Sequence, residues 1–418
     1  MLGSSWLREG MRVTTVVLGD LGRSPRMQYH AEALAAHEVD VDIVACAGSA
    51  LHAELRGHPR ITCHLLPPAR ERSLPRALLL PVAAGRAVLQ ALRLVWVFLV
   101  VLRKPDVILV QNPPAVPTLL VTIAAARLRG ARLIIDWHNL AWAVLALGIG
   151  PRHPLVSLAR WYERVLGRRA DGHLAVSDAL RAELAVRWGI APVRVLRDRP
   201  AERFAPLPDE ARRLLRRRLV ERLGLAGLEP ALVVSPTSWT RDEDFDLLLD
   251  AVRRCEALAA ERAFPDVLVL LTGRGPRRAR FEAQAATLPG RRLHVRTLWL
   301  EPDDYPRVLG AADLGLCLHR SASGLDLPMK IADMQGAGLP VCALDYGLCL
   351  DEALRHEDTG LRFADAAALA RQWIDLLATF PRATEHLARL RSNVEKARGT
   401  TWRAGWEAEA REVLLPHA

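Results

Sequence analysis

Lysine is nearly missing from this chain, although the chain is rich in positive charge. Of its 57 lysine and arginine residues, only Lys104, Lys330 and Lys396 are lysine. A sequence so biased toward arginine gives each lysine more weight than an ordinary surface charge. Lys330, which lies in a segment rich in glycine and proline, is therefore a candidate binding residue, with a solvated point charge as the alternative.

Paired cysteines and metal-ligand spacings are missing as well. None of the six cysteines forms a Cys-x-x-Cys pair, so we expect buried free thiols in a reducing compartment rather than disulfides. The chain also has no zinc-ligand spacing and no RNA-binding aromatic motif. Nucleic acid is therefore the weakest of the partners that a basic protein suggests.

Long apolar runs are the third absence. The first ten residues have no apolar core, so they do not predict a signal peptide. Residues 83–102 are very apolar, but Arg86 and Arg93 interrupt them, and a spanning helix needs roughly 20 mostly apolar residues. The segment predicts a well-buried helix, with an interfacial helix resting on a bilayer as the alternative. The flanking basic residues are Arg70, Arg72, Arg76, Arg103 and Lys104.

The net positive charge of the chain comes from its first half. Residues 1–200 hold 26 basic and 15 acidic residues, whereas residues 201–418 hold 31 and 32, and the whole chain has a net charge of +10. Such a field favours an anionic membrane surface or a phosphate-bearing substrate.

Short apolar segments alternate with helical patterns along the chain. The expected strands are 12–18, 41–45, 61–65, 107–110, 132–135, 172–176, 193–196, 231–235, 267–272, 293–297, 314–318 and 339–343. This alternation predicts an α/β fold with parallel sheets covered on both faces. An Arg- and Pro-rich stretch, 197–230, separates two such series, so we expect two facing, doubly wound, Rossmann-like domains. The expected parts are an acceptor-binding domain (1–200), a linker (201–230), a nucleotide-sugar-binding domain (231–400) and a helix that crosses back to the first domain (401–418).

Residues 321–345 carry the strongest local signal. Their sequence, SASGLDLPMKIADMQGAGLPVCALD, predicts a glycine turn, a short helix, a second glycine turn and a buried strand. The first turn can direct backbone N–H groups and a helix N-terminus at a phosphate. Lys330 follows one turn into the helix, and Asp333 lies three residues further on the same face. An anion clamp beside a carboxylate suits the diphosphate and ribose hydroxyls of a nucleotide sugar.

Several longer motifs occur in a fixed order. In the first half they are GDLGRSPRMQYH (19–30), QNPP (111–114), IDWHN (135–139), GPRHP (150–154) and WYE (161–163). In the second half they are TSWT (237–240), DEDF (242–245), WLE (299–301), DYP (304–306) and GLDLPMK (324–330). The series, which covers about residues 12–410, resembles the chitobiosyldiphosphodolichol β-mannosyltransferase family. The resemblance implies a GT-B glycosyltransferase with its ligands in the cleft between the two domains.

The resemblance also implies a reaction. It is transfer of mannose from GDP-mannose to the distal GlcNAc of a lipid-diphosphate acceptor, with inversion and a β-1,4 bond, by a peripheral protein at the cytoplasmic face of a membrane. We expect the protein to lack the N-terminal anchor of eukaryotic members, and its Ala, Arg and Leu bias is typical of bacteria. A bacterial polyprenyl-diphosphate-linked sugar is therefore an alternative to the dolichol-linked one.

Three residues are candidates for the base that such an inverting transfer requires. Asp20 lies in the loop after the first strand, and Asp136 and His138 follow the strand 132–135. The alternatives are loop bracing for Asp20, a structural hydrogen bond for Asp136 and a sugar or diphosphate contact without proton transfer for His138.

The glycine loop supplies the acceptor-binding candidates. Gly22, Arg23 and Arg26 can hold a diphosphate, because arginine matches phosphate oxygens well; solvated loop charges are the alternative. His30 is a fourth candidate, for which a packed core histidine is the simpler interpretation.

Donor binding is assigned to the second half of the chain. The candidates are Ser235, Thr237, Ser238, Gly273, Arg274, Gly275, His319, Gly324, Leu325, Asp326, Lys330 and Asp333. Many GT-B enzymes place an arginine and a lysine after the first strand of this domain, but here Arg241 is the only cation, so the diphosphate depends on Lys330 and backbone N–H groups. Asp333 takes the place where related transferases use glutamate for the ribose, with a surface carboxylate as the alternative.

Other functions stay open on the same fold. A retaining transferase or a nucleotide-sugar epimerase would usually have the missing Arg/Lys pair, and a non-catalytic membrane scaffold would not need Lys330 and Asp333. We expect no cofactor and no metal, because Asp242 and Asp244, which have the spacing of a metal-binding acidic pair, lie at a helix start, where capping explains them.

Overall fold

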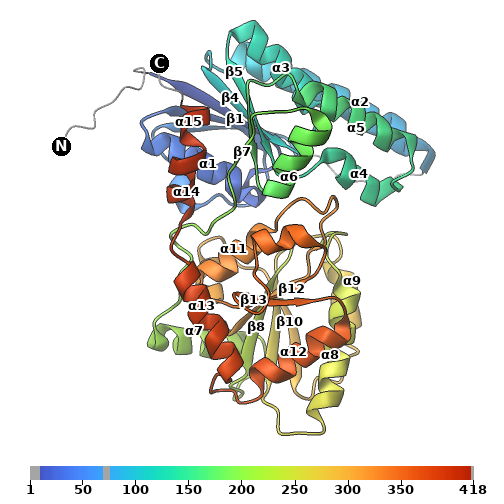
Figure 1. Cartoon of the computed structure of the whole chain (residues 1–418), viewed down its shortest axis with the longest axis vertical. Coiled ribbons are helices and arrows are strands. Elements are labelled where there is room, and N and C mark those ends of the chain that lie inside the picture. Colours follow the sequence, from blue (N-terminus) through green and yellow to red (C-terminus); the bar gives the residue numbers. More distant parts are fainter. Residues whose placement is uncertain (1–9, 69–75, 416–418) are drawn as a thin grey trace, which may run out of the picture. The chain divides into compact units, whose positions relative to one another are not determined.

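The chain folds into two compact units that are described separately. The computed structural model describes residues 10–68 and 76–415 (Figure 1). Unit 1 comprises residues 1–197 and 403–418, and unit 2 comprises residues 198–402. The flanking residues Arg70 and Arg72 lie outside the described part.

Unit 1 is built on a seven-stranded parallel sheet in the order β3-β2-β1-β4-β5-β6-β7. Its strands are β1 (Arg12–Asp20), β2 (Asp40–Cys46), β3 (Ile61–Leu66), β4 (Val107–Asn112), β5 (Arg132–Trp137), β6 (Gly172–Ala175) and β7 (Arg194–Val195). The central strands are almost continuously buried, as expected for a parallel sheet with helices on both faces.

Helices cover both faces of this sheet. They are α1 (Pro25–Ala36), α2 (Arg76–Trp96), α3 (Thr118–Arg129), α4 (Ala141–Ile149), α5 (Pro154–Gly167), α6 (Asp178–Ala182), α14 (Trp402–Glu409) and α15 (Arg411–Leu414). Helix α1 lies on one face with α14 and α15, and α2, α3 and α5 lie on the other (Figure 1). Trp406 of α14 is fully buried and donates a hydrogen bond to His30 of α1, so the C-terminal segment belongs to this core.

Unit 2 repeats the doubly wound pattern with a six-stranded parallel sheet in the order β10-β9-β8-β11-β12-β13. Its strands are β8 (Ala231–Pro236), β9 (Val267–Thr272), β10 (Leu293–Leu298), β11 (Leu314–Cys317), β12 (Val341–Leu344) and β13 (Gly360–Phe363). Its helices are α7 (Asp209–Arg222), α8 (Phe245–Ala259), α9 (Arg278–Ala285), α10 (Asp304–Ala311), α11 (Met329–Gly336), α12 (Ala366–Leu377) and α13 (Glu385–Ala397).

The structure differs from the sequence-based prediction in the linker and in several elements. Residues 201–230 are part of unit 2 rather than a free linker, because Arg212 and Arg216 of α7 form ion pairs with the buried Asp313. Strand β13 and helices α4 and α5 were not anticipated. All six cysteines lie in the described part and are free thiols; five are buried, as expected, whereas Cys63 is half-buried.

The prediction of a well-buried helix at residues 83–102 is wrong. Helix α2 continues into a π-helical turn, η3 (Val97–Val101). The segment Pro81–Val101 is long and apolar enough to cross a membrane, yet only 17% of its most apolar 18-residue stretch is buried. Leu92, Trp96 and Val100 are 62%, 58% and 67% exposed. Their hydrophobic surface is therefore not covered by the part of the chain that the structure describes.

Candidate functional site

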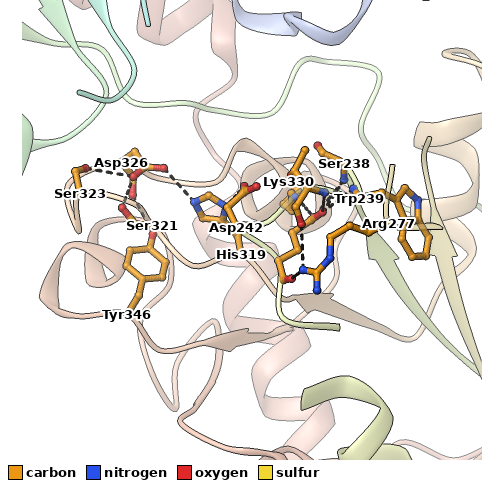
Figure 2. Close-up of polar contacts among 12 residues, drawn as sticks. Ser238, Trp239, Asp242, Arg277, His319, Ser321, Ser323, Asp326, Lys330 and Tyr346 are labelled. Atoms are coloured by element: carbon orange, nitrogen blue, oxygen red, sulfur yellow. Dashed lines mark hydrogen bonds and ion pairs between the residues drawn. The ribbon is translucent and has the colours of Figure 1, made fainter. Parts of the chain in front are cut away.

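The polar groups of unit 2 gather where parallel strands end. Strand β8 has β9 on one side and β11 on the other, and the chain winds away from it in both directions, so a crevice at the carboxyl ends is the expected binding place. Figure 2 shows the side chains there, which come from the segments after β8, β9, β11 and β12 and from α11.

A buried ion pair forms the centre of this group. The Nζ of Lys330 lies 2.6 Å from Glu243, whose side chain is 1% exposed. Glu243 also accepts hydrogen bonds from the backbone N–H groups of Ser238 and Trp239, at 3.0 and 2.8 Å. Burial alone would lower the pKa of Lys330, but the Glu243 charge outweighs it and the pKa lies above its ordinary value. Lys330 is therefore a fixed cation and not a mobile surface charge.

Trp239 holds the turn that supplies these N–H groups. It has a φ of 58°, in the left-handed region that non-glycine residues rarely adopt. Its ring is fully buried, stacked on Phe245 with centroids 4.7 Å apart and packed against Phe281. This packing stabilises the unusual backbone that directs successive N–H groups at Glu243.

A second cation lies between two carboxylates. His319 contacts Asp242 through Nδ1 at 3.1 Å and Asp326 through Nε2 at 3.0 Å (Figure 2). Burial alone would lower the pKa of His319, but these two hydrogen bonds raise it to about 9. The same contact with His319 helps to keep the pKa of Asp242 below its ordinary value despite burial. His319 is thus an imidazolium at neutral pH.

The glycine turn is arranged differently from the expectation. The N–H of Gly324 donates to the Ser321 hydroxyl at 2.8 Å, and the N–H of Leu325 donates to the Ser323 hydroxyl at 3.1 Å. The carboxylate of Asp326 binds His319 and the Ser321 hydroxyl. In this state, serine side chains therefore occupy N–H groups that were predicted to face a diphosphate.

Asp333 is buried rather than a surface carboxylate. It is 8% exposed, and its Oδ2 accepts a hydrogen bond from the Tyr305 hydroxyl at 3.2 Å. Burial raises the pKa of Asp333 to about 7, although Tyr305, Arg203 and Lys330 act in the opposite direction. At neutral pH, therefore, about half of the Asp333 carboxyl groups are ionised. The ionised form can accept hydrogen bonds from a ligand in place of the one from Tyr305.

The remaining donor-side candidates include a buried serine, two glycines and an exposed arginine. Ser235 is fully buried within β8, so it does not reach the loop region. A Cβ on Gly273 or Gly275 would lie 1.9 Å or 2.2 Å from the carbonyl oxygen of Thr237 or Ser238, so these glycines are needed for two loops to touch. Arg274 is exposed, and its guanidinium carbon lies 4.1 Å from the centre of the Trp299 ring.

In unit 1, Asp136 is the centre of a buried polar cluster. It is 0% exposed and pairs with Arg26 through both oxygens, at 2.8 and 2.9 Å. His30 and His138 approach the same carboxylate at 3.2 and 2.9 Å. Burial alone would raise the pKa of Asp136, but Arg26 and the histidines hold it well below its ordinary value.

This cluster changes the roles expected of two residues. Arg26 is 1% exposed and also donates to the carbonyl of Leu196, so it lies away from any surface that an acceptor diphosphate could reach. His30 is packed, as the simpler interpretation had it. Because the Trp406 indole can only donate, His30 accepts at Nδ1 and carries its proton on Nε2 toward Asp136.

His138 is the outward member of the cluster. Its side chain is 20% exposed, whereas that of Asp136 is fully buried. The contact through Nε2 leaves Nδ1 as the ring atom that can take up a proton. Behind this turn, Glu163 accepts hydrogen bonds from Asn112 and from the backbone of Ala141, and burial raises the pKa of Glu163 to about 7.

Asp20 braces two loops. Its carboxylate accepts hydrogen bonds from the N–H of Gly22, at 3.0 Å, and from the N–H and hydroxyl of Ser49, the latter at 2.7 Å. A Cβ on Gly22 would lie 2.5 Å from the carbonyl oxygen of Ser49, so no larger residue fits at this position. Arg23 is exposed beside this turn.

Sequence reasoning missed Glu243, Asp242 and Glu163 as members of these clusters. All three lie in motifs that carry the resemblance, but a carboxylate near a helix start or inside a helix has the pattern of an exposed residue. Asp244 does cap α8 by accepting the N–H of Leu247, whereas Asp242 pairs with His319 instead.

Known families of enzymes match both units of the chain. Residues 22–197 match the family described as "Glycosyl transferase 4-like domain", and residues 231–379 match "Glycosyl transferases group 1". The solved structure of a glycosyltransferase from Rickettsia africae has a TM-score of 0.63 at 16% identity and covers 98% of this chain and 100% of its own. The fold is that of the two-domain GT-B glycosyltransferases, and the chain is a glycosyltransferase.

Two curated relatives narrow the class. The chain is 39% identical to the human "Chitobiosyldiphosphodolichol beta-mannosyltransferase", covering 96% of this chain and 91% of that protein. It is 38% identical to the "UDP-glycosyltransferase TURAN" of Arabidopsis thaliana, covering 96% and 97%. The chain belongs to the chitobiosyldiphosphodolichol β-mannosyltransferase family.

Proposed function

We propose that this glycosyltransferase moves mannose from GDP-mannose to a GlcNAc-type sugar on a dolichyl or polyprenyl diphosphate. The new bond is β-1,4 and the anomeric configuration inverts. The observation that carries the proposal is the 39% identity to the human mannosyltransferase over 96% of the chain, across both units. One relative is named a mannosyltransferase and another a UDP-glycosyltransferase, so the experiment below compares donors with different bases and sugars.

Unit 2 supplies the groups that a leaving nucleoside diphosphate requires. Lys330 and the His319 imidazolium are two partly buried cations near the carboxyl ends of the strands, with side chains 16% and 12% exposed. Fixed positive charge in a site shielded from water stabilises the charge that develops on a leaving diphosphate. Asp333 would accept the ribose hydroxyls in place of Tyr305.

Unit 1 supplies the base. We assign proton removal from the acceptor hydroxyl to Nδ1 of His138, with Asp136 orienting the ring through Nε2. Asp136 is too buried and too strongly ion-paired to act as the base itself. Asp20 keeps a bracing role, and Arg23 stays a candidate contact for the acceptor diphosphate.

We propose that the reaction needs no metal. Within the described ranges, no group of three or more His, Cys, Asp or Glu residues is arranged to hold a metal ion. Lys330 and His319 would supply the positive charge that a metal supplies in other transferases. Activity that depends strictly on added Mn²⁺ would contradict this.

The function is tested by incubating the full chain with GDP-mannose, UDP-glucose or UDP-GlcNAc and a panel of lipid-diphosphate sugars. Mass spectrometry would identify the product, and NMR of the anomeric proton would give the configuration. We expect transfer of mannose to a GlcNAc-terminated lipid diphosphate with a β bond. An α product would identify a retaining transferase, and C2 inversion of the sugar nucleotide without transfer would identify an epimerase. Binding without turnover on any donor would favour a scaffold.

The pKa of Asp333 predicts how donor binding depends on pH. Ribose hydroxyls favour the ionised carboxylate, so affinity for a nucleoside diphosphate should rise as Asp333 loses its proton. With a pKa of about 7, we expect roughly a tenfold tighter Kd at pH 8 than at pH 6. Calorimetry at several pH values would measure it, and Asp333→Asn should bind more weakly with a flatter pH profile. The same slope in wild type and Asp333→Asn would refute the ribose assignment.

We propose that the exposed apolar surface of unit 1 contacts the membrane that carries the acceptor. Helices α2 and α3, α3 and α5, and α4 and α5 touch one another, so their apolar residues form one surface. Its exposed members include Val88, Leu92, Trp96, Val100, Leu120, Leu128, Leu147, Leu158 and Trp161. Arg103, Lys104 and Arg127 are exposed beside it and suit anionic headgroups, which supports a peripheral enzyme at the cytoplasmic face of a membrane.

Charged substitutions on this surface should release the protein from lipid. For Leu92→Asp with Trp96→Asp we expect binding to phosphatidylglycerol vesicles to weaken by more than about tenfold, because each large apolar side chain contributes ~1.5–3 kcal/mol when buried. Flotation assays would measure the bound fraction. Leu214→Asp with Leu348→Asp, two exposed apolar sites of unit 2, is the matched control. Equal flotation of both double variants would count against this surface.

A further inference from the structure

The segment that follows β10 carries an exposed aromatic group that the proposed function has not used. The indole Nε1 of Trp299 donates to Oε1 of Glu301 at 2.9 Å. The guanidinium carbon of Arg274 lies 4.1 Å from the centre of the Trp299 ring, which fixes the plane of the ring through a cation–π contact. Leu300 is buried between them and anchors the segment, while Glu301 and Arg274 are exposed and Trp299 is partly exposed. An oriented ring with a carboxylate at its edge is therefore open to a ligand.

The position of this group fits one end of a nucleotide. All strands of the unit 2 sheet are parallel, so their carboxyl ends meet at one edge, and β10 is three strands away from β11. At about 4.8 Å per strand this separation is ~14 Å, which suits an extended nucleoside diphosphate with its phosphates near His319 and Lys330.

A chain of contacts connects the two ends. The N–H of Tyr305 donates to the carbonyl of Glu301 at 3.1 Å, in the first turn of α10. The Tyr305 hydroxyl then reaches Asp333 at 3.2 Å, and Asp333 lies one helical turn after Lys330 on α11. A ligand with an anionic end at Lys330 and hydroxyls at Asp333 would therefore bring a ring next to residues 299–301.

We infer that Trp299 and Glu301 bind the nucleobase of the donor and select guanine; this inference rests on the proposed function. The Watson–Crick edge of guanine presents two neighbouring donors, the N1–H and the 2-amino group, which a carboxylate can accept together. Uracil presents one N–H between two carbonyls, and adenine presents one amino group beside a lone pair, so each places an acceptor against the carboxylate. Trp299 can stack on any base, whereas hydrogen bonds to Glu301 distinguish guanine from uracil and adenine.

These two roles are separable with hypoxanthine, which keeps the N1–H of guanine and lacks the 2-amino group. We would measure the Kd of GDP, IDP, ADP and UDP for the full chain by calorimetry. We expect GDP to bind about ten- to a hundredfold tighter than IDP, the usual effect of one hydrogen bond to a charged group. In Glu301→Gln the ratio should fall to near one. In Trp299→Ala both ligands should weaken by a similar factor, about ten- to a hundredfold, because stacking does not depend on the base.

Glu395→Gln is the matched control, because it removes one exposed glutamate charge elsewhere in unit 2. It should keep the wild-type ratio of GDP to IDP affinity. A ratio near one in the wild type, or an unchanged ratio in Glu301→Gln, would overturn the base assignment. Tighter binding of UDP or ADP than of GDP would also overturn it, but would leave a nucleotide-sugar transferase in place. If no nucleoside diphosphate bound, the proposed function would fail with it.

Discussion

Replacing Lys330 with methionine should lower kcat/KM about 100- to 1000-fold, the usual effect of removing one fixed group that stabilises a leaving anion. The same change should destabilise unit 2. Glu243, only 1% exposed, would lose its counter-ion, and breaking a buried pair in this way typically costs about 3–5 kcal/mol. Steady-state kinetics with GDP-mannose and urea unfolding would measure the two effects separately.

The control for this experiment is the double variant Lys330→Met with Glu243→Gln. The neutral amide can still accept the N–H groups of Ser238 and Trp239 through its oxygen, so the free energy of unfolding should recover most of its loss. Activity should stay low, because the cation is still missing. If the double variant recovered activity together with stability, Lys330 would have a structural role only and the donor site would need to be sought elsewhere.

The alternation of apolar segments is sufficient to predict two parallel sheets, because a strand buried on both faces appears in sequence as a short continuous apolar run. It could not predict β13, whose four residues include a glycine and an arginine. It also could not show that α2 is exposed. A helix that is apolar almost all round has the same composition whether it packs on protein or on lipid, so only the exposure of Trp96 and Val100 separates the two cases.

The site was predictable to the extent that glycine turns and strand ends mark it. Lys330, Asp333 and His319 were placed correctly at the ends of strands or on the helix that follows. Which charges pair with which could not be read from the sequence, because such partners come from distant segments. Arg26 and Asp136 are 110 residues apart, and Lys330 and Glu243 are 87 apart. An arginine in a loop motif therefore has the pattern of a ligand contact, although here it neutralises a buried carboxylate.

The largest catalytic effect should come from His138. In His138→Ala we expect kcat to fall about 100- to 10,000-fold, because that range is typical for loss of a general base. Donor affinity should stay near the wild-type value, because His138 belongs to unit 1 and the donor groups to unit 2. Stability should change little, since the side chain is partly exposed and Asp136 keeps Arg26 and His30 as partners. Single-turnover rates and GDP calorimetry would measure these quantities.

Two comparisons separate a base from a structural histidine. Added imidazole should partly restore the rate of His138→Ala, because a small base can enter the space left by the ring, and no packing role would respond in this way.

Asp20→Asn tests the competing base. Its carboxylate accepts hydrogen bonds from Gly22 and Ser49, so we expect a stability loss and a smaller effect on kcat. Asp136→Asn is a poorer probe, because it leaves the buried Arg26 without its counter-ion and would unfold the site along with the chemistry. An inactive Asp20→Asn beside an active His138→Ala would assign the base to Asp20 at the end of β1.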